Sequence, residues 1–275
     1  MESLSDLKKF SDTLGTQEKV MPLLFVGHGS PMNAIEENEF SNGWKRTGSE
    51  LPKPHAILCI SAHWETRGTF VTAMEHPKTI HDFYGFPQEL SEVEYPAPGD
   101  PRLAKQTKDA VKHTDVEFDN QWGLDHGCWS VLKHLYPAAD IPVIQLSMDY
   151  TKPSQWHYDL AKELAVLRKK GVLIIGSGNM VHNLRLIDWR HPSGAFDWAE
   201  EMNVKFKKFI LDGDSKQLIN YPSLGKPAAL AIPTPEHFLP LLYVLGLKEQ
   251  QESTTIFNDK LVMGSISMTS LKIGN

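Results

Sequence analysis

Short runs of apolar and often β-branched residues recur along the chain, separated by longer stretches of mixed polarity. Because consecutive residues in these runs are apolar, both faces of each run are hydrophobic, which is typical of strands in the interior of a sheet. The predicted strands are Pro22–Val26, Ala56–Ile60, Pro142–Leu146, Val172–Ile175, Ala228–Ile232 and Leu261–Ile266.

Segments between the strands carry helix start and stop signals. Asp100 before Pro101 is an N-cap pair, and Gly171, Gly213 and Gly246 are stop signals. The predicted helices run from Pro101 to about His113, from Pro153 to about Lys170, from about Phe196 to Leu211, and from Pro235 or Glu236 to Leu245. Alternating strands and helices predict an α/β fold, with a central, mostly parallel or mixed sheet that helices cover on both faces.

The chain is expected to form one domain. We find no internal repeat and no Gly/Ser linker, so residues 21–275 are assigned to a single domain and residues 1–20 to a polar N-terminal extension. The 28 Lys and Arg residues are scattered and the net charge is −6, so we expect no nucleic-acid partner. No segment has the apolar length of a signal peptide or a membrane span, which predicts a cytoplasmic protein without membrane association.

The count of 12 His against 2 Cys changes this ordinary picture. Zinc frameworks built on thiolates and disulfide scaffolds are excluded, so histidine must bind any metal that is present. Cys59 lies in an apolar run and Cys128 in a predicted loop. Two unpaired thiols fit a reducing compartment.

Four histidines follow predicted strands at a short distance. His28, His63, His182 and His237 follow Val26, Ile60, Ile175 and Ile232, with one to six residues in between. In open α/β sheets the carboxyl ends of the strands form the ligand crevice, so we predict a shared metal site there. Neutral imidazole suits Zn, Fe and Cu.

Glu236 beside His237 offers a second possibility for this site, a facial triad of two histidines and one carboxylate. Adjacent residues point in different directions, so we expect only one of the two to bind the metal.

Two further segments could take part in chemistry. His126, which follows Asp125 and precedes Gly127, is either a general acid or base or a residue of the loop before a helix. The aromatic segment 81–87, HDFYGFP, is either the wall of a pocket for a flat substrate or a surface loop. Residues 176–178, GSG, lack the spacing and the lysine of a phosphate-binding loop, so nucleotide binding is rejected.

Together these motifs resemble the LigB-like class III extradiol ring-cleaving dioxygenases, and most closely the 4,5-DOPA dioxygenase branch. The resemblance covers residues 21–270. The motifs, in the family's order, are Gly27–Pro31, Ser61–Glu65, His81–Pro87, Leu124–Gly127, Gly176–Gly178 with His182–Leu184, and Pro235–Phe238.

The resemblance implies an Fe(II) centre that zinc can also occupy. His28, His63 and His237 match the metal-ligand motifs of the family, and His182 matches a further active-site histidine that is either a fourth ligand or an acid–base group. His126 matches a residue suited to proton transfer. The wider class has a carboxylate as third ligand, which keeps Glu236 as the alternative to His237.

The implied activity is the insertion of O₂ into the ring of a DOPA-like catechol, which yields a muconate semialdehyde. The expected partners are a catechol-type small molecule and O₂, and the oligomeric state is left open. Competing interpretations are a zinc-dependent hydrolase, a tetrapyrrole metal chelatase, or a non-catalytic relative that keeps the pocket as a binding surface.

Overall fold

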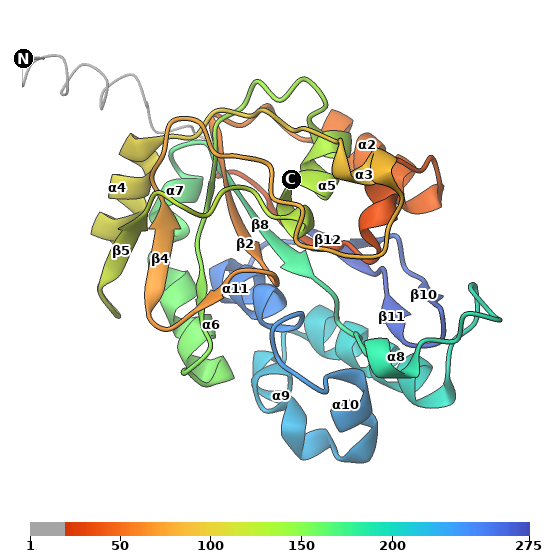
Figure 1. Cartoon of the computed structure of the whole chain (residues 1–275). Coiled ribbons are helices and arrows are strands. Elements are labelled where there is room, and N and C mark those ends of the chain that lie inside the picture. Colours follow the sequence, from red (N-terminus) through yellow and green to blue (C-terminus); the bar gives the residue numbers. More distant parts are fainter. Residues whose placement is uncertain (1–19) are drawn as a thin grey trace, which may run out of the picture.

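The central element is a six-stranded sheet (Figure 1). The structure is a computed structural model that describes residues 20–275, so nearly all of the predicted N-terminal extension lies outside the described residues. From edge to edge the sheet runs β6 (Val143–Gln145), β2 (Ala56–Ser61), β8 (Val172–Gly178), β1 (Leu23–Gly27), β12 (Ser270–Ile273) and β9 (Thr254–Phe257). The first four strands are parallel, and β12 pairs antiparallel with both of its neighbours. The predicted mixed sheet in a single α/β domain is confirmed.

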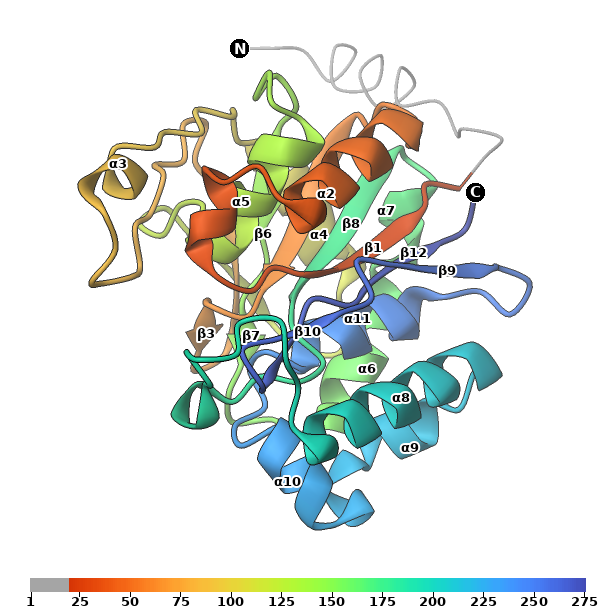
Figure 2. The same cartoon turned by 90° about the vertical axis from the view of Figure 1, so that its right-hand side faces the viewer.

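Helices cover both faces of the sheet (Figure 2). One face carries α4 (Pro101–Ala110), α6 (Ser154–Glu163), α7 (Ala165–Arg168), α8 (Asp197–Asp212), α9 (Ser215–Ile219), α10 (Lys226–Ala231) and α11 (Leu239–Leu247). The other carries α2 (Glu39–Glu50), α3 (Gln88–Ser91) and α5 (His126–Leu135). Short pairs lie outside the sheet: β3 (Glu65–Thr66) with β7 (Met148–Asp149), β4 (Thr69–Thr72) with β5 (Val116–Asp119), and β10 (Leu261–Val262) with β11 (Ile266–Ser267). The 3₁₀ turns are η1 (Pro31–Ala34), η2 (Leu184–Leu186) and η3 (Tyr221–Leu224).

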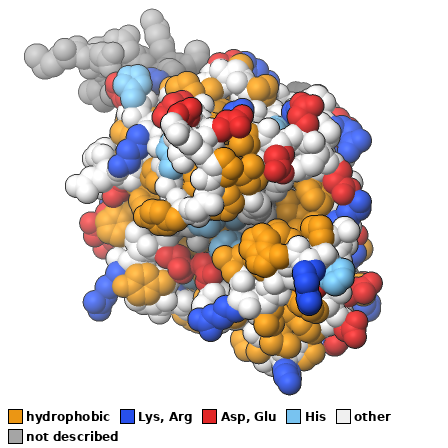
Figure 3. All heavy atoms as spheres, turned by 45° about the vertical axis from the view of Figure 1, so that its right-hand side comes forward, with side chains coloured by type: hydrophobic (Ala, Val, Ile, Leu, Met, Phe, Trp, Pro, Cys, Tyr) orange, Lys and Arg blue, Asp and Glu red, His pale blue; other side chains and the backbone are white. Residues whose placement is uncertain are grey.

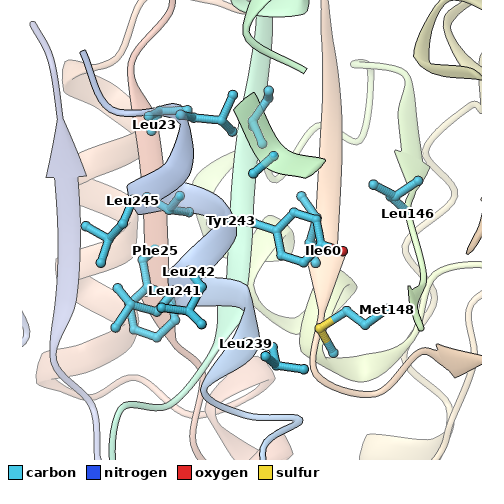
Figure 4. Packing of buried hydrophobic residues seen from close by; sticks show 14 of the residues in the cluster. Leu23, Phe25, Ile60, Leu146, Met148, Leu239, Leu241, Leu242, Tyr243 and Leu245 are labelled. Atoms are coloured by element: carbon cyan, nitrogen blue, oxygen red, sulfur yellow. The ribbon is translucent and has the colours of Figure 1, made fainter. Parts of the chain in front are cut away.

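Strand β1 shows why its apolar run has no polar face. Leu23 and Phe25 point into the apolar layer under α11, whereas Leu24 and Val26 point into the layer under α2 and α5. In the first layer, Leu241 and Leu242 of α11 pack close to Phe25 (Figure 4). Burial on both faces therefore explains the continuous hydrophobic pattern.

Two of the predicted strands are wrong. Residues 228–232 belong mostly to helix α10, because the alanine-rich run Ala228–Ala231 favours a helix and Pro227 stands in its first turn. Residues 261–266 form two short strands, β10 and β11, joined by a turn in which Met263 and Gly264 have positive φ angles of 49° and 78°. An apolar run of five or six residues does not by itself distinguish these outcomes.

The helix predictions are mostly right but differ at their ends. The helix at Pro101 ends at Ala110, three residues early, and the one predicted over 153–170 is broken at Leu164 into α6 and α7. The last helix starts at Leu239 and continues through Gly246 to Leu247. Gly246 is not a stop signal, because a Cβ there would lie 2.4 Å from the carbonyl oxygen of Tyr158. It is a contact point where α11 approaches α6 closely.

The two cysteines are free and buried in the same apolar layer, Cys59 on β2 and Cys128 on α5. Cys128 therefore lies in a helix and not in the predicted loop. Within residues 20–275, no helix is both long enough and apolar enough to cross a bilayer.

His157 lies in the contact between α6 and α11, away from the sheet edge that carries the other motifs. Its side chain is fully buried, with Nδ1 3.0 Å from the hydroxyl of Tyr243. Burial lowers the pKa of His157 to about 4. Since an unfolded histidine has a pKa near 6.5, the unfolded chain takes up this proton first, and stability falls as the pH drops from about 6.5 to about 4.

We therefore predict that His157→Gln is destabilised less at low pH than at neutral pH. Its deficit in unfolding free energy relative to wild type should shrink by about 2 to 3 kcal/mol between pH 7.5 and 4.5. The wild type loses stability over this range because its unfolded chain takes up a proton on His157, whereas the variant has no histidine there. Urea unfolding at both pH values measures the difference. The exposed His76 supplies a control, His76→Gln, with a constant difference. An equally constant deficit for His157→Gln would contradict the prediction.

Candidate metal centre

Three parallel strands, β1, β2 and β8, end at one edge of the sheet, and each leads to a histidine. His28 follows β1 directly, His63 comes two residues after β2, and His182 four residues after β8. The backbone pairing continues beyond the strands, since the amide of His28 donates to the carbonyl of Gly178 at 3.2 Å. For these three histidines the predicted strand-end placement is correct.

His237 reaches the same edge by another route. It lies in the loop between α10 and α11, so it follows a helix and not the strand that the sequence predicted. The amide of Asn179, just beyond β8, donates to its carbonyl oxygen at 2.8 Å. The predicted position at the sheet edge was right although the predicted local structure was wrong, because the loop packs on the end of β8.

The imidazoles of His28, His63 and His237 form a nearly equilateral triangle. Their ring centroids are 5.0 Å (His28–His63), 5.1 Å (His63–His237) and 5.4 Å (His28–His237) apart. His28 and His237 are buried, and His63 is partly exposed. Figure 3 shows imidazole atoms within a hollow that hydrophobic and acidic side chains border. By contrast, a cavity of about 690 Å³ between α2 and α8 contains none of these histidines.

The tautomer of His28 follows from its neighbours. The hydroxyl of Ser177 lies 2.5 Å from the carbonyl oxygen of Gly127, which can only accept, so the hydroxyl must donate its proton there. Ser177 Oγ, 3.0 Å from Nδ1 of His28, therefore accepts from that nitrogen. Burial lowers the pKa of His28 well below 6.5, and the nearby rings of His63 and His126 lower it further. The ring is thus neutral, with its free lone pair on Nε2.

His63 and His237 also have acceptors beside Nδ1. Nδ1 of His63 lies 3.4 Å from a carboxylate oxygen of Asp82, and Nδ1 of His237 lies 3.2 Å from one of Glu236. Burial, with the neighbouring histidines, lowers the pKa of His63 to about 3 and that of His237 well below 6.5. Carboxylates beside Nδ1 favour the Nδ1–H tautomer and leave Nε2 available as a ligand atom.

The chemistry of this donor set fits a cation. Nε2 of His28 and Nε2 of His63 are 3.1 Å apart, and with both Nδ1 atoms protonated their lone pairs face each other. Such a pair is repulsive unless a positive charge lies between or beside the two nitrogens. Neutral imidazoles with acceptors at the far nitrogen are the usual ligands of Zn and Fe.

His126 is the first residue of α5, after the N-cap Asp125. Its ring centroid is 3.9 Å from that of His63, and its Nδ1 is 3.0 Å from Asp82, although not in the alignment of a hydrogen bond. Burial raises the pKa of Asp82, but its contacts with the imidazoles of His126 and His63 lower it by more, so the net shift is downward. An ionised carboxylate therefore lies between the two rings.

His182 stacks on His237, with ring centroids 3.5 Å apart and an angle of 10° between the planes. Burial, together with His126, lowers the pKa of His182 to about 4. The lone pairs of an imidazole lie in the plane of its ring, so those of His182 and His237 lie in two nearly parallel planes, one stacked on the other. His182 thus belongs to the site through its stacking on one corner of the triangle.

Possible ligand atoms within 4.8 Å of one another form two adjoining groups among the described residues. One is His28, His63 and His126, and the other is His182, Glu236 and His237. The metal set expected from the sequence, His28, His63, His182 and His237, draws on both groups. The structure thus brings all the candidate residues together. His28 and His63 of the triangle belong to the first group, and His237 belongs to the second.

The aromatic segment 81–87 contacts the histidine cluster through one residue and is exposed at others. Phe83 meets the ring of His126 edge-on at 5.7 Å, whereas Tyr84 is 94% exposed and Phe86 37% exposed. Two residues that contact the histidine cluster escaped the sequence analysis, Asp82 in this segment and Ser177 in the GSG motif. The only signal was their presence inside motifs that had been singled out for other residues.

Comparison with known proteins agrees with this geometry. Residues 22–271 match the family described as the catalytic LigB subunit of aromatic ring-opening dioxygenase. The chain belongs to the LigB family. It is 49% identical over 258 residues to a 4,5-DOPA dioxygenase extradiol of Escherichia coli strain K12, and the alignment covers 92% of this chain and 95% of the relative. A protein of the same name from Beta vulgaris is 34% identical over 273 residues, covering 94% and 98%.

The fold of this LigB chain also has a solved counterpart. A crystal structure of an uncharacterized protein from Escherichia coli K12 superimposes with a TM-score of 0.79 at 43% identity, covering 92% of this chain and all of that one. The family is one of dioxygenases, and the histidine cluster gives this member a candidate metal site.

We predict that Ser177→Ala weakens zinc binding by about tenfold or more, because Nδ1 of His28 loses its acceptor. Stability should fall by about 1 to 3 kcal/mol, since the carbonyl of Gly127 loses its donor. Chelator competition and urea unfolding measure the two effects.

A matched control for this variant is Ser41→Ala, which removes another buried hydroxyl that donates to a backbone carbonyl, that of Asn38 at 3.2 Å. It should lose stability and keep the zinc affinity of the wild type. Equal zinc affinities for Ser177→Ala and Ser41→Ala would contradict the assigned role of Ser177.

Proposed function

We propose that this LigB-family chain is a non-haem Fe(II) extradiol dioxygenase that opens the ring of a DOPA-like catechol. The observation that carries the proposal is the triangle of neutral imidazoles with their Nε2 lone pairs free, beside two further histidines. The names of the relatives, 4,5-DOPA dioxygenase extradiol, support the same reaction. The catalytic domain would span residues 21–275, and both atoms of O₂ would enter the product, a muconate semialdehyde.

In this proposal His28, His63 and His237 hold the metal through Nε2. Glu236 accepts from Nδ1 of His237 and so orients that ligand without binding the metal itself. When bound, Fe(II) would supply redox chemistry and Lewis acidity at these ligands, whereas zinc could occupy the same ligands without redox chemistry.

The remaining histidines would move protons. With Nδ1 of His126 beside the carboxylate of Asp82, its Nε2 is the atom free to take a proton from a catechol hydroxyl. His182 is neutral near pH 7 and stacked on the ligand His237, so it would bind the ring or return a proton later in the reaction rather than serve as a fourth ligand. Phe83, edge-on to His126, would form one wall for the flat substrate.

The competing hypotheses receive less support. A zinc hydrolase or a tetrapyrrole chelatase would not explain relatives that are named as dioxygenases over almost the full chain. A non-catalytic relative would have no need for the two histidines beside the triangle. The two free, buried cysteines favour a reducing compartment, and we include a cytoplasmic location in the proposal.

The first test is O₂ consumption. Protein loaded anaerobically with Fe(II) should take up O₂ with at least one member of a catechol panel and form a yellow product, while zinc-loaded protein should not. An iron-loaded protein that consumes no O₂ with any catechol would refute the proposed function, and O₂-independent turnover with zinc alone would favour the hydrolase.

His126→Ala tests the proton-transfer role in the same assay. The expected loss in kcat is about 10²- to 10⁴-fold, the usual contribution of a general acid or base. His113→Ala is the matched control, because its side chain is exposed. Cleavage by His126→Ala at the wild-type rate would remove the role of His126 and leave the rest of the proposal standing.

Titration with zinc separates ligand from orienting residue at positions 236 and 237. His237→Ala should lose tight binding, whereas Glu236→Gln should weaken binding by about tenfold or less, because the amide oxygen can still accept from Nδ1 of His237. The reverse order of losses would make Glu236 the ligand.

A further inference from the structure

The carboxylate of Asp82 spans two imidazoles that the proposed function gives different tasks. One oxygen lies 3.0 Å from Nδ1 of His126 and also accepts from the backbone amide of His126 at 2.9 Å. The other lies 3.4 Å from Nδ1 of His63. A single side chain therefore contacts a proposed metal ligand and the proposed proton carrier.

Within the described residues, Nδ1 of His126 is buried and makes no aligned hydrogen bond. An N–H enclosed in this way is costly unless an acceptor is within reach, and the oxygen of Asp82 at 3.0 Å meets that need after a small rotation of the ring. The carboxylate can accept on both oxygens at once, which suits two N–H groups from two rings.

Asp82 is held in place by the helix that carries His126. The amide of Ile80 donates to the carbonyl of Leu124 at 2.7 Å, and the indole nitrogen of Trp129 on α5 donates to the carbonyl of Ile80 at 2.8 Å. These hydrogen bonds thus attach residues 80–82 to α5 and to the residues just before it, although 80–82 have no regular secondary structure of their own.

We propose that Asp82 is a positioning residue that holds His63 and His126 together in the Nδ1–H tautomer. Nε2 of His63 is then free for the metal and Nε2 of His126 for the substrate. The part concerning His126 rests on the proposed function, whereas the part concerning His63 requires only that the cluster binds a metal.

Asp82→Asn keeps the shape of the side chain but can accept a hydrogen bond from only one of the two imidazoles, His63 or His126. The amide keeps one acceptor oxygen, but its NH₂ group is a donor and opposes an N–H. One of the two rings must therefore change its tautomer or turn away. Asp82→Ala removes both acceptors and serves as a second variant if the asparagine form does not fold.

Two measurements on zinc-free and zinc-titrated protein test the proposal without turnover. Long-range ¹⁵N NMR of labelled histidines at pH 7.5 should show Nδ1–H for both His63 and His126 in the wild type, and for at most one of them in Asp82→Asn. Zinc affinity, by chelator competition, should fall about 10- to 100-fold. Asp119→Asn is the matched control, because among residues 20–275 that carboxylate accepts only from the backbone amides of Gln121 and Trp122; it should change neither quantity.

With the iron-loaded enzyme, Asp82→Asn should lower kcat about 10- to 100-fold with a smaller change in KM, because proton transfer suffers more than binding. Unchanged tautomers and unchanged zinc affinity in both Asp82 variants would overturn the proposal. If the wild type cleaves no catechol, the proposed function fails, but the NMR and zinc measurements still decide whether Asp82 positions the two rings.

Discussion

Nε2 of His28 and Nε2 of His63 lie 3.1 Å apart, and this close approach determines which charge and which tautomer the surrounding residues must give to the two rings. Each ring must be neutral, and the full burial of His28 and the partial burial of His63 disfavour the charged form. Each must also carry its proton on the outer nitrogen, so each needs an acceptor there. Ser177 and Asp82 supply these acceptors, and they come from different parts of the chain. The polar residues around the rings are therefore as necessary as the rings themselves.

The parallel sheet makes this convergence possible. Strands β1, β2 and β8 are neighbours, so residues far apart in sequence leave the sheet side by side. The apolar layers on both faces hold these strands rigidly, and the polar chemistry is confined to the edge where they end. His126, at the start of α5, faces the same edge because its helix packs against β2. A rigid support of this kind keeps ligand atoms within the narrow tolerances of a metal site.

The fold class and the position of the site could be predicted because they depend on local patterns. Apolar runs buried on both faces mark β1, β2 and β8, and a histidine after each marks the edge. The helix at 226–231 could not be separated from a strand, because a run of five apolar residues fits either. The hydrogen-bond partners of the histidine rings could not be predicted for another reason. Ser177 meets His28 across 149 residues, and whether a serine or an aspartate turns toward a given ring depends on packing that no local pattern records.

Strand β12 has a bearing on when the histidine cluster can form. It pairs with β1, the strand that carries His28, and the preceding Met268 lies so close to Gly27 that a Cβ there would be 2.7 Å from its backbone. β12 follows every histidine of the cluster along the chain, so it leaves the ribosome after all of them. Until it arrives, β1 is an open edge strand and the backbone beside His28 lacks its support. The complete histidine cluster can therefore bind a metal only after the residues of β12 have been synthesised.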